Sequence, residues 1–265
     1  MPLEQIVVLA IVQGITEFLP ISSSGHLILI PELTNWADQG IVTDVMVHVG
    51  SLFAILAYFW RDIIQLIIGF FELLQLKWND RSRLAAYIIL ATIPAVIAGL
   101  FLKSIGFFEQ IRGIQIVAWN AIIFGILLYV SDRYGQKLFS MFEMKLPQAL
   151  VIGVAQALAL IPGTSRSGIT ITAARFLGFK REEAARFSFL LGAPAMAGAG
   201  ILIYLDILER GESIPIDAIY AAILSFFSAI VAIAFLMSIV KRMSFLPFVI
   251  YRLLLGIGLL YVAYT

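Results

Sequence analysis

Cysteine is absent from this chain of 265 residues. Its absence excludes disulfides, thiolate metal sites and a cysteine nucleophile, and it leaves the redox compartment undecided. Histidine is almost as scarce, so imidazole chemistry is limited to His26 and His48. The formal net charge is only +1 and no cluster of basic residues stands out, which argues against a nucleic-acid partner.

Charged residues of either sign are also rare. They make up 13% of the chain, whereas 61% of the residues are hydrophobic. A soluble domain carries roughly 25% charged residues, and a water-exposed surface built from this composition would be mostly hydrocarbon. Membrane integration is therefore expected. The first residues, "MPLEQIVVLA", lack the basic region and cleavage site of a signal peptide, so they are expected to remain in the mature protein.

Six apolar stretches are long enough to cross a membrane. A helix of about 20 residues spans the roughly 30 Å of hydrocarbon in a bilayer. The stretches that meet this length are 42–60, 84–102, 113–130, 184–205, 217–239 and 246–264.

Two further apolar regions are interrupted by small polar islands. The region 3–33 is broken by "PISSSGH" at 20–26, and the region 146–178 is broken by "PGTSRSG" at 162–168. Each half is too short to span a membrane, so both regions are predicted to be re-entrant helix hairpins. Irregular backbone at that depth must be buried in protein or line a wet cavity.

The basic residues support this layout. If both hairpins turn back, the short loops on one side carry twelve basic residues and those on the other carry three. The positive-inside rule then places loops 61–83, 131–145 and 240–245 in the cytoplasm and both termini outside. The two groups are Arg61, Lys77, Arg81, Arg83, Arg133, Lys137, Lys145, Lys180, Arg181, Arg186, Lys241 and Arg242 against Lys103, Arg112 and Arg210.

Two arginines outside these groups, Arg175 and Arg252, need separate interpretation. Arg175 is expected to extend its charge to the cytoplasmic face, as are Arg181 and Arg186. Arg252 falls within the last apolar stretch and is expected to face the bundle interior, with a structural partner.

The two halves of the chain resemble each other. A shift of 143 residues places Gln13 on Gln156, Ser22 on Ser165, Ser24 on Ser167 and Gly25 on Gly168. The alternative is chance similarity between turns rich in serine and glycine. The predicted fold is a single all-α polytopic membrane domain over 1–265, built from two inverted-topology repeats at about 1–130 and 146–265. Each repeat holds one re-entrant hairpin and three transmembrane helices, a plan whose sites form from broken helices near the midplane.

A glutamine and a glutamate precede the first island. Gln13 and Glu17 are four residues apart, which places them on one helical face. A carboxylate in a membrane normally marks a functional site or a buried partner. Together with an amide oxygen it suits a hard cation such as Mg²⁺ or Ca²⁺. The alternative is a structural hydrogen bond between helices.

The first island itself offers hydroxyls and an imidazole. Ser22, Ser23, Ser24 and Gly25 are typical of an anion-binding turn at a helix N-terminus. His26 follows in the first helical turn and could act as a general acid or base. A serine beside a base is the usual arrangement for nucleophilic catalysis. The alternative for His26 is an interhelical contact.

The second island offers positive charge. Arg166 lies between Ser165 and Ser167, and its planar guanidinium matches a phosphate group. The alternative is a salt bridge to Glu17, which would also bring the two islands together. A carboxylate, hydroxyls, a histidine and an arginine at membrane depth indicate a site for a phosphate attached to a lipid.

These motifs are similar to those of a known family. "QGITEFLPISSSGH" and "PGTSRSG" resemble the signature segments of the undecaprenyl-diphosphatases, also called bacitracin-resistance proteins, and the resemblance covers nearly the whole chain. It implies two inverted repeats with re-entrant hairpins and hydrolysis of undecaprenyl diphosphate to undecaprenyl phosphate, which recycles the carrier lipid of bacterial cell-wall synthesis. It also implies a divalent cation, a location in the bacterial plasma (inner) membrane and an active site open toward the outer face. A homodimer is left open.

The resemblance assigns roles residue by residue. The acidic motif falls on Gln13 and Glu17, where glutamine puts a two-carboxylate metal site in doubt. The proposed nucleophile falls on Ser23, the histidine on His26 and the phosphate-binding arginine on Arg166. Whether Ser23, His26 or a water attacks phosphorus stays open. Other phosphate contacts are expected from Ser22, Ser24, Gly25, Gly163, Thr164, Ser165, Ser167 and Gly168.

Two other functions share some of these features. A polyprenyl-phosphate flippase is the main alternative, because inverted repeats with facing hairpins are also a transport plan. A lipid phosphatase with a vanadium-haloperoxidase-like site needs a histidine beyond the arginine. No histidine follows His48, so that family is excluded.

Overall fold

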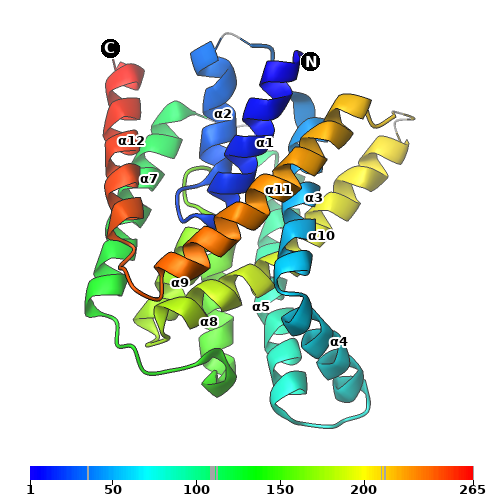
Figure 1. The fold of residues 1–265 in the computed structure, drawn as a ribbon, viewed down its shortest axis with the longest axis vertical. Coiled ribbons are helices and arrows are strands. Elements are labelled where there is room, and N and C mark those ends of the chain that lie inside the picture. The colour runs from blue at the N-terminus through cyan, green and yellow to red at the C-terminus, as the bar shows by residue number, and fades with distance from the viewer. Residues whose placement is uncertain (35, 108–110, 112, 210, 212, 265) are drawn as a thin grey trace.

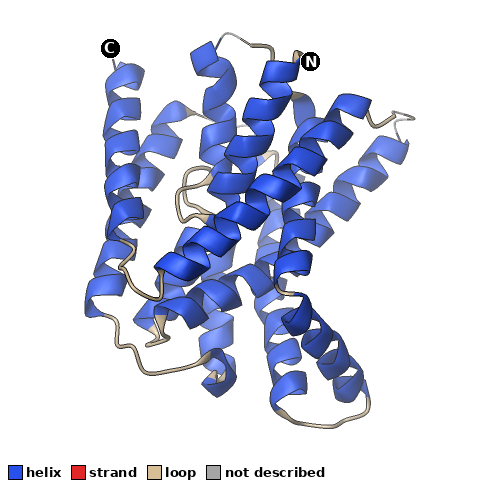
Figure 2. Cartoon of the chain, viewed as in Figure 1, coloured by secondary structure: helices blue, strands red, loops and turns tan. Residues whose placement is uncertain are grey.

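The computed structural model describes residues 1–34, 36–107, 111, 113–209, 211 and 213–264. Within these ranges the chain forms helices and no strand, apart from one isolated bridge between Phe139 and Phe179. Figure 1 labels the helices, and Figure 2 shows how short the connecting loops are. The bounds are α1 Leu3–Phe18, α2 Ser23–Thr34, α3 Gly40–Tyr58, α4 Trp60–Leu74, α5 Asp80–Ser104, α7 Ile114–Tyr134, η1 Met141–Glu143, α8 Leu146–Leu158, α9 Arg166–Phe176, α10 Arg181–Glu209, α11 Ile216–Ile239 and α12 Leu246–Tyr264.

All six predicted spans are confirmed as helices long and apolar enough to cross a membrane. They are α3, α5, α7, α10, α11 and α12, and the described chain holds six such helices. The largest differences in length are at α10, which has 29 residues, and at α5, which has 25. Both extend past the predicted hydrophobic stretch at both ends because their first and last turns carry charged residues that hydropathy alone excludes.

The prediction that 61–83 is a loop is wrong. Most of it is helix α4, which follows α3 after the single residue Phe59 and packs on α5. Gly69 permits this close approach, since a Cβ there would lie 2.4 Å from the carbonyl oxygen of Arg81. Asn79 then caps α5 by accepting hydrogen bonds from the amides of Arg81 and Ser82 at 2.9 and 3.1 Å.

The two interrupted regions form helical hairpins, as predicted. Helices α1 and α2 have 16 and 12 residues, and α8 and α9 have 13 and 11. At 1.5 Å per residue none of the four covers about 30 Å. In Figure 1, α1 runs inward from the end that holds both termini and α2 returns to that end, while the loops of the two hairpins meet inside the molecule.

Several helix contacts are similar in the two halves of the chain. Helix α1 packs on α11, and α8 packs on α5, while α3 packs on α10 and α7 on α12. Small residues allow the first two contacts. Gly14 of α1 faces the backbone of Ser225, and Gly153 of α8 faces that of Ala91. Close approach at small residues is how helices associate when both are apolar.

A buried charge cluster joins three helices at the end opposite the termini. Asp132 of α7 accepts hydrogen bonds from Arg175 at 3.2 Å and from Arg181 at 2.6 and 3.0 Å. Arg175 is fully buried, so the prediction that it extends to the surface is wrong. Its guanidinium instead donates hydrogen bonds to Asp132 and to carbonyl oxygens, among them that of Phe179. Arg181 and Arg186 are partly exposed and pair with Asp132 and Asp62.

At the terminal end basic side chains are sparse among the described residues. Lys103 pairs with Asp206 at 3.2 Å. Arg112 and Arg210, the other two basic residues predicted for this side, lie outside the described residues.

Candidate active site

The two polar islands fold into the same turn. Ser22 and Ser165 both adopt positive φ angles, 75° and 72°, which are uncommon for residues other than glycine. The Ser22 hydroxyl accepts from the Gly25 amide at 3.4 Å, and the Ser165 hydroxyl accepts from the Gly168 amide at 3.1 Å. The predicted correspondence at a spacing of 143 residues therefore extends to the backbone and to the hydrogen bonds.

Arg252 of α12 holds the two turns together. Its side chain is fully buried and donates to five carbonyl oxygens at 2.9 to 3.2 Å, so its predicted position in the bundle interior is confirmed. The acceptors come from the first turn, the second turn and α7, and they are Pro20, Gly163, Thr164, Asn120 and Ala121. Carbonyl dipoles take the place of an acidic partner here.

Further contacts fix the second turn. Ser167 Oγ donates to the carbonyl of Leu19 at 3.2 Å, and Asn120 Nδ2 donates to that of Pro162 at 2.8 Å. Gly163 has φ of +85° and lies against Val117, where a Cβ would be only 2.5 Å from the carbonyl oxygen. Glycine is required at this position by both conformation and space.

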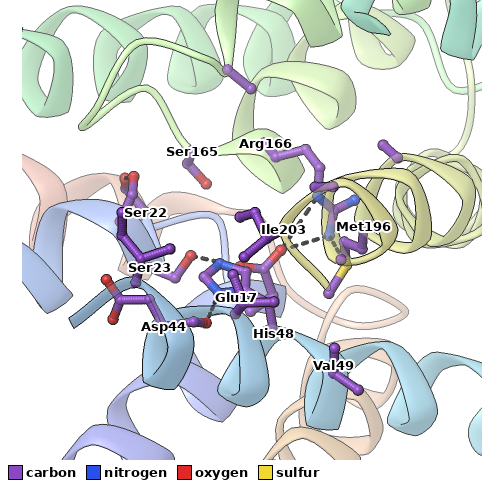
Figure 3. A pocket seen from close by; sticks show the side chains of 17 residues that line it. Glu17, Ser22, Ser23, Asp44, His48, Val49, Ser165, Arg166, Met196 and Ile203 are labelled. Carbon is purple, nitrogen blue, oxygen red and sulfur yellow. Dashed lines mark hydrogen bonds and ion pairs between the residues drawn. The ribbon is translucent and has the colours of Figure 1, made fainter. Parts of the chain in front are cut away.

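A cavity of about 390 Å³ opens beside the turns. The first turn and Glu17 of α1 form one side, α3 and α10 form the walls, and Arg166 enters from α9 (Figure 3). The polar lining residues are Glu17, Ser22, Ser23, Ser24, Asp44, His48, Ser165 and Arg166, and the remaining ones are small or apolar, such as Val45, Ala195, Met196 and Gly200. Helices α2 and α9 both have their N-termini at this cavity, and the partial positive charge of a helix N-terminus favours an anionic ligand.

Glu17 is the centre of the polar contacts. Its Oε2 accepts from Ser23 Oγ at 2.6 Å and from Gln13 Nε2 at 3.1 Å, and His48 Nε2 lies 3.7 Å away. Its Oε1 accepts from Arg166 Nη2 at 3.0 Å and from Nε at 3.4 Å. The structure thus brings together residues from both islands, and the alternative of a Glu17–Arg166 salt bridge is present.

Arg166 is held by α10 as well as by Glu17. Its Nη1 donates to the carbonyl of Ser188 at 3.1 Å. Gly192 leaves the space that the guanidinium occupies, since a Cβ there would lie 1.8 Å from Nη1. This position explains how a long charged side chain reaches the cavity without displacing α10.

The two histidines lie in different places. His26 is not among the residues that line the cavity. Its Nδ1 donates to the Ser22 carbonyl at 2.7 Å, and its Nε2 is 2.5 Å from the Tyr251 hydroxyl. His48 does line the cavity, and its Nδ1 donates to the Asp44 carbonyl at 2.6 Å, which turns Nε2 toward Glu17. His48 and Asp44 were not predicted as site residues.

Several predicted phosphate contacts lie behind the cavity wall. Gly25, Gly163, Thr164, Ser167 and Gly168 are buried and do not line it. Their atoms shape the turns instead, as in the bonds from Ser167 to Leu19 and from Gly168 to Ser165. Ser22, Ser23, Ser24 and Ser165 do reach the cavity.

The residues near Glu17 offer a second oxygen acceptor beside the carboxylate. Gln13 Oε1 is buried and has no hydrogen-bond partner among the described residues, so an acceptor is available beside the carboxylate. The described part of the chain contains no group of three or more aspartate, glutamate, histidine or cysteine side chains placed to hold a metal. These oxygens fit a hard cation only if other ligands, such as substrate phosphates or waters, complete its shell.

Comparisons with known proteins identify the family of this chain. Residues 6–258 match the family model described as "Bacitracin resistance protein BacA". A relative from Alteromonas mediterranea is 48% identical and aligns over the full length of both chains. One from Erythrobacter litoralis is 46% identical over 97% of this chain and 98% of its own length. Both are named undecaprenyl-diphosphatase. The chain belongs to the family of the bacitracin resistance protein BacA.

Proposed function

We propose that this protein is an undecaprenyl-diphosphatase, which hydrolyses undecaprenyl diphosphate to undecaprenyl phosphate and inorganic phosphate and so recycles a carrier lipid of bacterial cell-wall synthesis. The relatives carry this name over the full length of the chain. The observation that carries the proposal is the 2.6 Å hydrogen bond from Ser23 Oγ to Glu17, opposite Arg166, in a cavity among helices that could span a membrane. A hydroxyl paired with a base beside a guanidinium is suited to phosphoryl transfer.

Ser23 is the nucleophile in this proposal. Its Oγ attacks the terminal phosphorus, the bond from phosphorus to the bridging oxygen breaks, and undecaprenyl phosphate leaves. The Ser23 proton passes to Glu17 Oε2, its present hydrogen-bond acceptor. Arg166 moves from Glu17 to the phosphoryl oxygens as Glu17 becomes protonated, while the amides at the start of α2 hold the same oxygens.

Water then hydrolyses the phosphoserine, which releases inorganic phosphate and restores Ser23. This step needs a group that takes a proton from water. His26 is the residue predicted for proton transfer, and a specific observation adds His48, because its Nε2 faces Glu17 inside the cavity. His26 does not line the cavity, so its role would be to orient the serine turn through its hydrogen bonds to the Ser22 carbonyl and the Tyr251 hydroxyl.

A divalent cation, Mg²⁺ or Ca²⁺, is proposed to bind at Glu17 and Gln13, with Asp44 as a further carboxylate at the cavity wall. When bound it would neutralise charge on the diphosphate.

The same proposal includes inverted repeats and an orientation. The matching turns, and the corresponding packing of α1 on α11 and α8 on α5, support two copies of opposite topology. The excess of basic residues at the end opposite the termini supports placing that end in the cytoplasm of a bacterial inner membrane, with the cavity open toward the outer face.

Phosphate release by the purified protein in detergent tests the proposal. We expect turnover of undecaprenyl diphosphate by the native protein, loss of turnover in Ser23→Ala, and inhibition by a chelator that Mg²⁺ or Ca²⁺ reverses. Trapping of a phosphoserine at residue 23 would identify the nucleophile, and full activity of Ser23→Ala would leave a water or His26 in that role. His26→Gln and His48→Gln, compared at several pH values, decide which imidazole moves the proton.

A flippase is the second candidate, because the facing hairpins and matching turns also suit a transporter. Transport cannot occur in detergent. Bound polyprenyl phosphate without phosphate release would therefore favour the flippase.

A further inference from the structure

A second cavity lies at the end of the molecule opposite the termini. It has a volume of about 210 Å³ and forms where α7 ends, α10 begins and α12 begins, at the lower left of Figure 1. Its basic lining residues are Arg133, Lys137 and Arg181, beside Asp132. Along α10, Arg181 is fifteen residues from Met196 of the first cavity, or roughly 20 Å, so the two cavities are separate.

The charge in this cavity is not balanced. Asp132 is already engaged by Arg175 and Arg181 and by the amide of Phe245 at 3.1 Å. The carboxylate of Asp132 is thus paired with two arginines, Arg175 and Arg181. Arg133 and Lys137 have no ion pair within the described ranges, and both side chains are exposed. An excess of positive charge without an internal partner indicates a binding site for an anion.

The remaining lining residues indicate what kind of anion. Tyr129 and Ser244 bring hydroxyls that can donate hydrogen bonds. Tyr129 and Leu246 are also 42% and 43% exposed, and they lie near the ends of α7 and α12, two helices that could span a membrane. A basic pocket with an apolar rim at the end of such helices matches a phosphate that carries an acyl or prenyl tail.

We propose that this cavity binds the phosphate-bearing head group of an anionic membrane lipid, in addition to the ligand of the first cavity. Arg133 and Lys137 supply the charge, and Asp132 holds Arg181 at the wall with its guanidinium partly exposed. The proposal does not depend on the reaction assigned to the first cavity.

The test uses the purified full-length protein and titrates three probes: short-chain phosphatidylglycerol, phosphatidylcholine with the same chains, and inorganic phosphate. The apparent Kd is taken from the shift in thermal unfolding. Arg133→Gln with Lys137→Gln removes the free charges, and Arg61→Gln with Lys77→Gln is the matched control, since those residues are exposed and do not line the cavity. Neither double variant changes a residue of the first cavity, so a probe that binds there affects the Kd of both variants equally.

We expect phosphatidylglycerol to bind the Arg133→Gln, Lys137→Gln variant roughly twenty-five-fold more weakly than the native protein, because each lost cation weakens binding roughly five-fold. The control variant should bind it with a Kd within about two-fold of the native value. An equal loss for inorganic phosphate would also support the site and show that free phosphate can occupy it. Equal Kd values in all three proteins, or no preference for phosphatidylglycerol over phosphatidylcholine, would overturn the proposal. If the double variant does not fold, Lys137→Gln alone should still weaken binding roughly five-fold.

Discussion

Replacement of Arg252 by methionine tests whether this residue holds the active site together. The guanidinium donates to five buried or partly buried carbonyls, and two of these, Gly163 and Thr164, belong to the turn that carries Arg166. Methionine fills a similar volume but donates no hydrogen bond. The carbonyl of Pro20, in the other turn, loses its link to the second turn in the same step.

The expected cost follows from the carbonyls left without a donor. The carbonyls of Asn120 and Ala121 lie within α7 and keep their intrahelical donors, so Pro20, Gly163 and Thr164 are the three left without one. An unsatisfied buried polar group costs about 1–3 kcal/mol, so these three cost at least about 3 kcal/mol, unless the turns separate and admit water. This is a large share of the stability of many domains, about 5–15 kcal/mol. Lysine has three donors and no fork, so Arg252→Lys can satisfy at most three of the five acceptors and should fall between the native protein and Arg252→Met.

The assay is thermal unfolding in detergent combined with phosphate release at temperatures where each variant is folded. We expect Arg252→Met to unfold at a much lower temperature and Arg252→Lys to show intermediate stability with reduced turnover. Arg242→Met, on the exposed loop before α12, is the control and should change stability by less than about 0.5 kcal/mol. A methionine variant as stable and active as the control would refute the positioning role.

Three further substitutions test other parts of the structure. Arg166→Lys should lower phosphate release at least about a hundred-fold, because lysine lacks the planar fork, and near-native turnover would remove Arg166 from the site. Gly163→Ala should abolish activity by forcing the second turn off Val117, whereas Gly198→Ala, where a Cβ meets nothing within 4 Å, should be neutral; equal activity of the two would contradict the turn geometry. Asp132→Ala should lower the free energy of unfolding by about 3–5 kcal/mol because it leaves Arg175 buried without its carboxylate. Asp206→Ala, which breaks an exposed pair, should lower it by about 1 kcal/mol or less, and similar unfolding temperatures of the two variants would argue against the buried cluster.

The arrangement of spans was predictable because hydropathy responds to length and composition, which the membrane itself constrains. Helix α4 was missed for the same reason. Charged residues at Arg61, Asp62 and Glu72 lower its average hydropathy, and its 15 residues are too few for a span. It packs against α5 at Gly69, a contact between segments that hydropathy does not register.

The residues that line the candidate site could be grouped from the sequence only where they are adjacent in it. Glu17 and Ser23 lie in one motif, and Arg166 lies in a motif that repeats it. His48 enters the cavity from a different span, and its distance to Glu17 depends on how α3 packs beside α1. Conversely, His26 belongs to the motif but bonds to Tyr251 of α12, a partner 225 residues away.

The facing turns solve a geometric problem that one turn could not. Ser23 and Arg166 correspond at the spacing of 143 residues, and each is the first residue of its helix, α2 or α9. Successive residues at one helix N-terminus point about 100° apart, so a hydroxyl and a guanidinium from a single turn would diverge. Two copies of the turn, held face to face by Arg252, instead aim the same position of each copy at Glu17. One turn carries serine there and the other arginine, so a hydroxyl and a positive charge converge on Glu17 at the N-termini of both helices.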